Sequence, residues 1–113
     1  MTATRIAGIG SYLPEDRVTN DDLTKFMDTS DEWIQERTGI KSRRYGKRRK
    51  ETTAIMGAKA AAVAIERAGI SKEEVDFIIF ATLSPDYYFP GSGVLMQREL
   101  GMTSTEVGCL DIR

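Results

Sequence analysis

The most regular hydrophobic pattern in the chain lies between residues 52 and 68. Its apolar residues follow the three-four spacing of one helix face: Ile55, Ala58, Ala62 and Ile65. Seven alanines make this predicted helix thin, so neighbouring elements can approach it closely. A helix that is apolar over most of its circumference is usually buried, and Gly69 is expected to end it.

Two further apolar stretches are typical of β-strands on either side of a short helix. Residues 75–83 are continuously apolar from Phe77 to Ala81, as in a parallel strand covered on both faces. A helix over 92–100, ended by Gly101, and a strand over 106–112 follow. Strand, helix and strand predict a right-handed βαβ unit, and hence an α/β fold with a mixed or parallel sheet.

The patterns before residue 52 are weaker. Residues 4–10 predict a short first strand that leads into a glycine turn. Gly8 and Gly10 start like a dinucleotide-binding fingerprint, but Leu13 occupies the position of its third glycine, so we interpret them as a tight turn. Residues 20–27 predict a helix with Asn20 as its N-cap.

Two loops carry unusual side chains. Tyr87, Tyr88 and Phe89 are consecutive in the loop over 84–93, and because exposed aromatic side chains are costly, we expect them to pack. The segment Lys41–Lys50 holds seven basic residues in ten and no apolar period, which predicts a surface loop. It could attract phosphates or an acidic protein, although a solvated loop is the interpretation that we favour.

The segment Thr29–Ile40 predicts one short, well-delimited helix. Thr29 or Ser30 can cap it, Thr29 with Glu32 has the spacing of a capping box, and Gly39 can end it. Trp33 and Arg37 lie four residues apart and so share a helix face. A flat aromatic ring beside a planar cation can hold a nucleotide by stacking and by phosphate pairing. Local chemistry alone favours the alternative, a tryptophan that anchors the helix and a solvated arginine.

Composition narrows the function. The chain has 113 residues, 41% hydrophobic and 29% charged, with a net charge of -1, so nothing draws it as a whole to nucleic acid or membrane. It has no histidine, which excludes a self-contained histidine-dependent active site; no metal site is expected. A single cysteine, no apolar run of about 20 residues and no signal-peptide pattern lead us to expect a cytoplasmic protein.

Several stretches in order along the chain resemble one enzyme family: Gly8–Pro14, Thr29–Ile40, Ala68–Ile70, Ala81–Thr82, Phe89–Pro90, Gln97, Leu100–Gly101 and Leu110–Ile112. They are similar to the amino-terminal third of β-ketoacyl-acyl-carrier-protein synthase III, the condensing enzyme that starts bacterial fatty-acid synthesis. The resemblance implies a thiolase fold, normally a homodimer. It also implies condensation of an acyl-CoA, such as acetyl-CoA, with malonyl-acyl-carrier protein, and no resident cofactor.

The same resemblance assigns roles to individual residues. It implies that Trp33 stacks on the adenine of coenzyme A, that Arg37 meets its phosphates and that Thr29 adds a polar contact. Phe89 matches a loop phenylalanine that reaches across the dimer to shape the partner's acyl pocket; ordinary packing under the loop is a close alternative. No catalytic residue falls in this chain: the family's cysteine nucleophile lies just beyond the last predicted strand, and Cys109 is expected to be a buried, inert thiol.

Residues 1–113 are therefore expected to form an incomplete amino-terminal segment of a thiolase-like domain that is inactive alone. The last predicted strand ends at the edge where open α/β sheets gather ligands, which also suggests a piece of a larger protein. Two alternatives stay open. One is another thiolase-fold acyltransferase, such as a secondary-metabolite or hydroxymethylglutaryl-type synthase. The other is a non-catalytic α/β module that binds a nucleotide or a protein.

Overall fold

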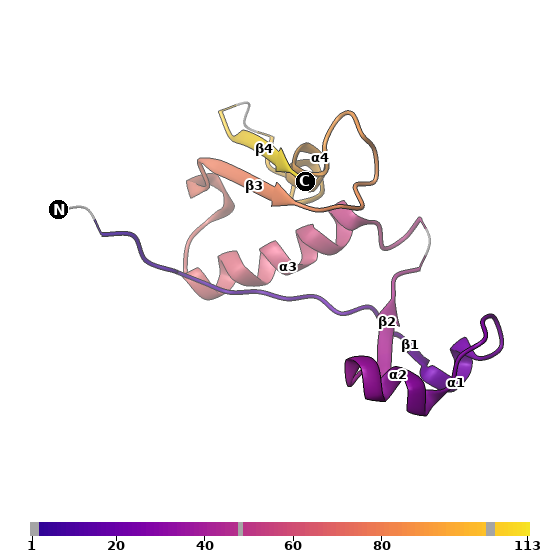
Figure 1. Cartoon of the computed structure of the whole chain (residues 1–113). Coiled ribbons are helices and arrows are strands. Elements are labelled where there is room, and N and C mark those ends of the chain that lie inside the picture. Colours follow the sequence, from indigo (N-terminus) through magenta and orange to yellow (C-terminus); the bar gives the residue numbers. More distant parts are fainter. Residues whose placement is uncertain (1–2, 48, 104–105) are drawn as a thin grey trace.

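The structure is a computed structural model that describes residues 3–47, 49–103 and 106–113, so Arg48 of the basic run lies outside the described residues. Figure 1 shows two parts. The first, called the hairpin part, is an antiparallel pair of strands whose connection contains helices α1 (Asn20–Leu23) and α2 (Asp31–Thr38). The second is a carboxyl-terminal part with α3 (Thr53–Ala68), β3 (Phe77–Ala81), α4 (Ser92–Glu99) and β4 (Gly108–Ile112). An extended segment over residues 3–14 passes along α3 and then enters the hairpin. The chain is accordingly elongated, with principal extents of 51 × 33 × 24 Å.

The carboxyl-terminal part confirms the predicted strand–helix–strand order. β3 (Phe77–Ala81) pairs in parallel with β4 (Gly108–Ile112), and α4 (Ser92–Glu99) connects them. α3 (Thr53–Ala68) has Thr52 as its N-cap and ends at Gly69, where φ is a left-handed 69°. A short 3-10 helix, η1 (Lys72–Glu74), precedes β3. The core of this part consists of Ala58, Ile78, Met96 and Met102.

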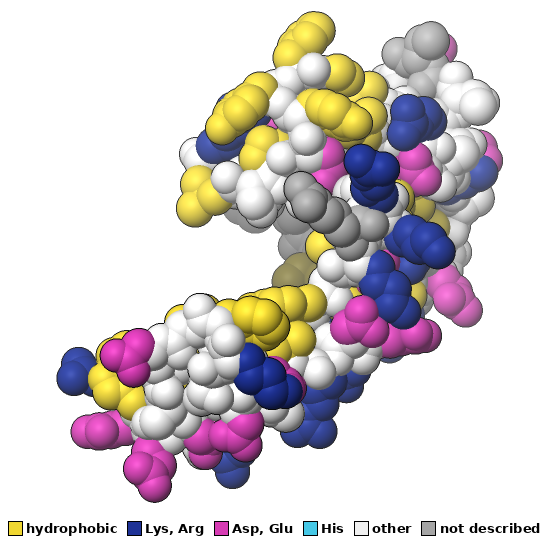
Figure 2. Space-filling view, turned by 90° about the vertical axis from the view of Figure 1, so that its right-hand side faces the viewer, with side chains coloured by type: hydrophobic (Ala, Val, Ile, Leu, Met, Phe, Trp, Pro, Cys, Tyr) yellow, Lys and Arg dark blue, Asp and Glu magenta, His cyan; other side chains and the backbone are white. Residues whose placement is uncertain are grey.

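The sheet is covered on one face, whereas the continuous apolar run predicted cover on both. Ile78 is buried, but its neighbours Phe77 and Ile79 are exposed. Because alternate strand residues point to opposite faces, and α3 and α4 supply core residues to the Ile78 side only, the other face stays open within the described residues. Figure 2 shows hydrophobic side chains at the surface of this part.

The predicted first strand over residues 4–10 is not formed, and Gly8 and Gly10 are not in a turn. Both instead lie against the backbone of α3. A Cβ atom at Gly10 would lie 2.5 Å from the backbone nitrogen of Ala64, and one at Gly8 would lie 2.8 Å from that of Ala68. These glycines therefore permit a close approach of the extended segment to the alanine-rich helix.

The amino-terminal part contains a hairpin that the sequence pattern did not predict. β1 (Asp16–Thr19) pairs antiparallel with β2 (Ser42–Tyr45), so residues 42–45 of the predicted basic loop form a strand. Neither strand has an apolar alternation, because both are mainly polar, and each has two exposed and two partly buried residues. Their pairing depends on a partner more than twenty residues away, which local periodicity does not reveal.

α1 (Asn20–Leu23) is shorter than predicted, and its N-cap is Thr19 rather than Asn20. The Thr19 side chain accepts from the backbone N–H of Asp22, and the Asp22 carboxylate accepts from the backbone N–H of Thr19 at 3.0 Å. This is a complete capping box. Because Thr19 caps the helix, the Asn20 side chain does not, and it is buried instead.

The three aromatic residues expected to pack are exposed: Tyr87, Tyr88 and Phe89. Their loop is held at its base, where the backbone N–H of Gly93 donates to Asp111 Oδ1 at 3.0 Å and the Arg113 guanidinium lies 4.8 Å from the Tyr88 ring centroid. Through the described part of the chain, every helix is too short or too polar to cross a lipid bilayer.

Candidate functional site

The Trp33–Arg37 pair lies on α2 (Asp31–Thr38), whose bounds agree with the sequence prediction. The N-cap is Ser30, whose Oγ accepts from the backbone N–H of Trp33 at 3.1 Å. The proposed capping box of Thr29 with Glu32 is therefore not what begins the helix. Gly39 ends it, as predicted, with a left-handed φ of 70°.

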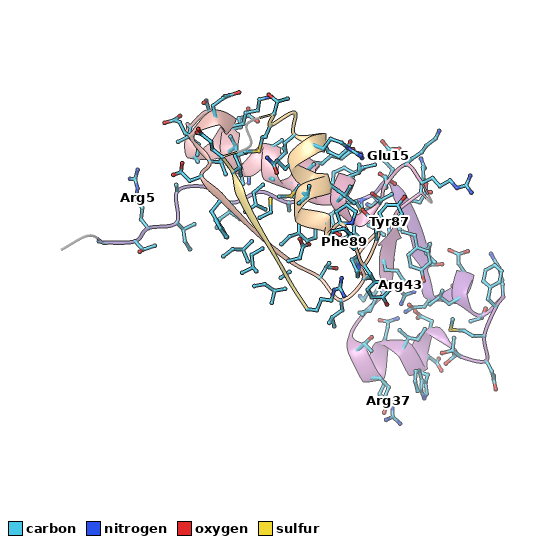
Figure 3. All side chains as sticks on the ribbon, turned by 90° about the horizontal axis from the view of Figure 1, so that it is seen from above. Arg5, Glu15, Arg37, Arg43, Tyr87 and Phe89 are labelled. Carbon is cyan, nitrogen blue, oxygen red and sulfur yellow. The ribbon has the colours of Figure 1, made fainter. Side chains whose placement is uncertain are left out.

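Trp33 does not anchor the helix, so that half of the interpretation favoured by local chemistry is wrong, whereas the solvated Arg37 is confirmed. The residue that packs inward is Ile34, which is 8% exposed, whereas Trp33 is 54% exposed. The Arg37 guanidinium carbon lies 5.5 Å from the centroid of the Trp33 ring, within the range of a cation–π contact. Figure 3 shows Arg37 extending outward from α2. An exposed aromatic face thus stands beside an exposed cation.

A shallow hollow adjoins the ring of Trp33, and Asp28, Thr29 and Ser30 complete its lining. The hydroxyl oxygen of Thr29 is buried and has no hydrogen-bond partner among the described residues. A buried hydroxyl without a partner is costly, but this oxygen has almost no exposed surface, so a group in the hollow reaches it only after the Thr29 side chain rotates. Thr29 and Trp33 line this hollow, and Arg37 contacts the Trp33 ring. The three residues that the resemblance assigns to one site thus lie close together on one short segment.

The residue that connects this segment to its surroundings is Asn20, which the sequence pattern marks only as a helix cap. Asn20 is 1% exposed, and its amide donates to Asp31 Oδ1 and to the carbonyl oxygen of Ile40, each at 2.7 Å. Its own carbonyl accepts from Arg43 Nη2 at 2.8 Å. The only local signal was an asparagine at the start of a predicted helix. The sequence is the same whether this asparagine caps the helix or is buried, so it does not reveal the second role.

Phe89 does not join this group. It is 92% exposed and lies in the loop before α4, on the carboxyl-terminal part, whereas α2 belongs to the hairpin part (Figures 1 and 3). The packing that was its alternative role is absent from the described part of the chain. Its assignment to an acyl pocket across a dimer stays a prediction.

Cys109 lies within β4, with its Sγ 3.5 Å from Gln97 Oε1. Burial, and to a lesser degree the charge of Asp111, raise the pKa of the thiol above its ordinary value. A reactive cysteine needs the opposite shift, which agrees with an inert thiol, although Cys109 is only partly buried rather than buried as expected. No cluster of three or more His, Cys, Asp or Glu side chains able to hold a metal occurs within the described ranges.

Much of the described basic run is engaged within the chain. Arg44 donates to the carbonyl oxygen of Glu15 at 2.7 Å, and Lys47 Nζ lies 3.6 Å from the Glu15 carboxylate and 3.7 Å from that of Asp16. The charges of Asp16 and Glu15 accordingly raise the pKa of Lys47. Figure 2 shows basic and acidic side chains next to one another on this face. Docking of an acidic carrier protein to this run stays a prediction.

Comparisons with known proteins agree over nearly the whole chain. No family model matches. A β-ketoacyl-[acyl-carrier-protein] synthase III of Clostridium acetobutylicum is 48% identical over 112 residues, which are 99% of this chain and 33% of that protein. The chain thus spans about a third of the length of the curated relatives that it matches.

Solved structures give the same picture. The 3-oxoacyl-[acyl-carrier-protein] synthase III from Aquifex aeolicus VF5 matches with a TM-score of 0.86 and 45% identity, over 96% of this chain and 35% of that one. The priming β-ketosynthase from the R1128 polyketide biosynthetic pathway also has a TM-score of 0.86, at 34% identity, over 96% of this chain and 31% of that one. These neighbours confirm an α/β, partial thiolase fold.

Proposed function

This chain is homologous to the amino-terminal third of the β-ketoacyl-acyl-carrier-protein synthases III, and from that premise we propose that its helix α2 binds the adenine nucleotide of coenzyme A. The observation that carries the proposal is the exposed Trp33 ring with the Arg37 guanidinium 5.5 Å from its centroid. A purine can stack on the free face of the ring, as bases do on aromatic side chains. The guanidinium can meet the phosphates as a fork of N–H donors.

Thr29 completes the proposed contact. Thr29 lines the hollow that adjoins Trp33, and its buried hydroxyl has no partner among the described residues. Rotation of the Thr29 side chain toward the hollow would let a polar edge of the bound nucleotide satisfy this hydroxyl and so remove a cost that the free protein bears. One stacking surface, one cation and one hydroxyl together give a site for a planar, phosphorylated ligand.

The activity that we propose for the whole protein is condensation of an acyl-CoA, acetyl-CoA by preference, with malonyl-acyl-carrier protein at the start of fatty-acid synthesis. It would work as a cytoplasmic homodimer, with acyl-CoA as substrate and no resident cofactor. Phe89 would then reach into the partner's acyl pocket, for which its 92% exposure is suited. The 113 residues contain no histidine, so alone they are expected to bind coenzyme A without turning it over.

A second candidate has an observation of its own. The priming β-ketosynthase of a polyketide pathway matches this fold with the same TM-score, 0.86, as the Aquifex synthase. Initiation of secondary-metabolite synthesis from another acyl-CoA would use the same adenine site. The two candidates differ in acyl preference, and comparing acetyl-CoA with longer acyl-CoAs as substrates of the whole protein separates them.

The binding proposal is tested by titrating the chain with coenzyme A while its fluorescence is followed. Trp33 is the only tryptophan, so the signal comes from α2. We expect saturable quenching, competition by adenosine diphosphate, and no competition by pantetheine, which lacks the adenine. Absence of binding in parallel equilibrium dialysis, or equal competition by pantetheine, would contradict the proposal.

A further inference from the structure

The helix that carries the proposed site is too short to hold its own geometry. α2 has eight residues, and isolated helices below roughly 12–15 residues are marginal in water. Ile34 is its one buried residue, so little apolar surface fixes its position. Something else must keep the Trp33 ring and the Arg37 guanidinium in register with the hollow beside Thr29.

Asn20 has the geometry to do this, because a single buried amide is bonded to both ends of α2. One N–H goes to Asp31, the first residue of the helix, and the other goes to the carbonyl of Ile40, the residue after the Gly39 cap. Trp33 and Arg37 lie between these two attachment points. One rigid planar amide therefore holds both the first residue of the helix and the residue that follows its cap.

Both N–H groups and the oxygen of the Asn20 side-chain amide are hydrogen-bonded. Its oxygen accepts from Arg43 of β2, so the amide also ties α2 to the hairpin. The other oxygen of Asp31 accepts from Gln35, one helical turn on, which extends the attachment into the middle of α2. Because a buried polar group with its partners removed is unfavourable, this network admits few alternative positions of the helix.

We propose that Asn20 is a positioning residue of the nucleotide site, acting through Asp31 and Ile40 to hold Trp33 and Arg37 in the arrangement that binds coenzyme A. This inference rests on the proposed function and adds to it a residue that does not touch the ligand. Substitution of Asn20 is accordingly expected to disturb α2 and ligand affinity together, while the β3–β4 part is unaffected.

Asn20→Asp is the sharpest perturbation, because it conserves the size of the side chain but replaces its NH₂ group by an oxygen. That oxygen would face the two acceptors, Asp31 Oδ1 and the Ile40 carbonyl, with no hydrogen to donate. We expect the Kd for coenzyme A to rise about tenfold, the equivalent of one hydrogen bond at about 1.4 kcal/mol. Hydrogen exchange of the α2 amides should accelerate, with β3 amides unchanged. If the variant does not fold, Asn20→Ser, which removes the contacts without adding charge, replaces it in the same two measurements.

Adding Asp31→Asn supplies a rescue. The double variant Asn20→Asp/Asp31→Asn reverses one donor–acceptor pair and should recover part of the lost affinity, a coupling that a general loss of stability would not produce. Ile78→Val serves as the control, because Ile78 is buried in the core beside α3 and α4 rather than under α2. It should lower the unfolding temperature without changing the Kd.

The results separate the two claims. An unchanged Kd and unchanged α2 exchange in the Asn20 variants would overturn the positioning role, as would an equal rise in Kd from Ile78→Val. If the native chain fails to bind coenzyme A, the proposed function fails. Exchange of the α2 amides then still decides whether Asn20 holds the Trp33–Arg37 arrangement.

Discussion

Replacing Arg37 by alanine is expected to weaken coenzyme A binding by about 5- to 30-fold. Two unit charges 4 Å apart attract by about 1 kcal/mol in water and about 4 kcal/mol near a protein surface. Because the Arg37 side chain is exposed, we take roughly 1–2 kcal/mol, and each 1.4 kcal/mol corresponds to a factor of about ten in Kd. Arg37→Lys should give a smaller loss, since it keeps the charge but loses the two-pronged donor geometry.

Isothermal titration calorimetry is the suitable assay, because removing Arg37 also removes its contact with the Trp33 ring and would alter the fluorescence. The difference between native and variant Kd should shrink as salt rises, since the Debye length falls from about 30 Å at 0.01 M to about 3 Å at 1 M. A difference that is independent of salt would mean that Arg37 does not act through the phosphate charges.

Glu36 offers a matched control, being the exposed neighbour of Arg37 with the opposite charge. Glu36→Ala should leave the Kd unchanged or lower it slightly, because it removes a charge that repels phosphate. The reasoning is refuted if Arg37→Ala leaves the Kd unchanged at low salt, or if Glu36→Ala weakens binding as much as Arg37→Ala does.

Three further predictions concern other parts of the chain. Gly10→Ala should destabilise it by about 1–3 kcal/mol, because the added Cβ would meet the backbone of α3 at Ala64; an unchanged urea midpoint would contradict this close approach. Cys109 should react with iodoacetamide more slowly than a free cysteine at neutral pH, since burial raises its pKa; an equal or faster rate would be contrary to an inert thiol. Hydrogen bonds from Lys25 and Thr19 hold the pKa of Asp22 below its ordinary value, so its ionised form stabilises the fold above about pH 4 and this stabilisation is lost as the pH falls further. Asp22→Asn should therefore lower the urea midpoint at neutral pH but much less in acid, and a deficit that does not depend on pH would count against the capping box.

Local signals were sufficient for much of the fold. The three-four spacing and Gly69 gave α3, and the apolar run from Phe77 to Ala81 gave β3, because these features depend on residues close in sequence. The β1–β2 hairpin was missed because its two polar strands are stabilised by each other across the intervening α1 and α2. The glycines at 8 and 10 were misinterpreted for a related reason: α3, which they approach, is about fifty residues away.

The candidate site was only partly predictable. The helix bounds, with Gly39 as the stop, and the common face of Trp33 and Arg37 follow from spacing alone. Which side chain faces the core does not, because Trp33 and Ile34 are adjacent and both apolar; the structure buries Ile34. The role of Asn20 depends on partners at Asp31, Ile40 and Arg43 that only the folded chain brings together.

The central claim is that the adenine of coenzyme A stacks on Trp33. The most direct test is nuclear Overhauser transfer between the indole protons of Trp33, unique in this chain, and the adenine ring protons of bound coenzyme A. With isotope-labelled coenzyme A, we expect strong magnetisation transfer between the Trp33 indole protons and the labelled adenine protons. This transfer should disappear when unlabelled adenosine diphosphate is added in excess. Saturated binding with no transfer between the indole and adenine protons would place the nucleotide elsewhere and contradict the account.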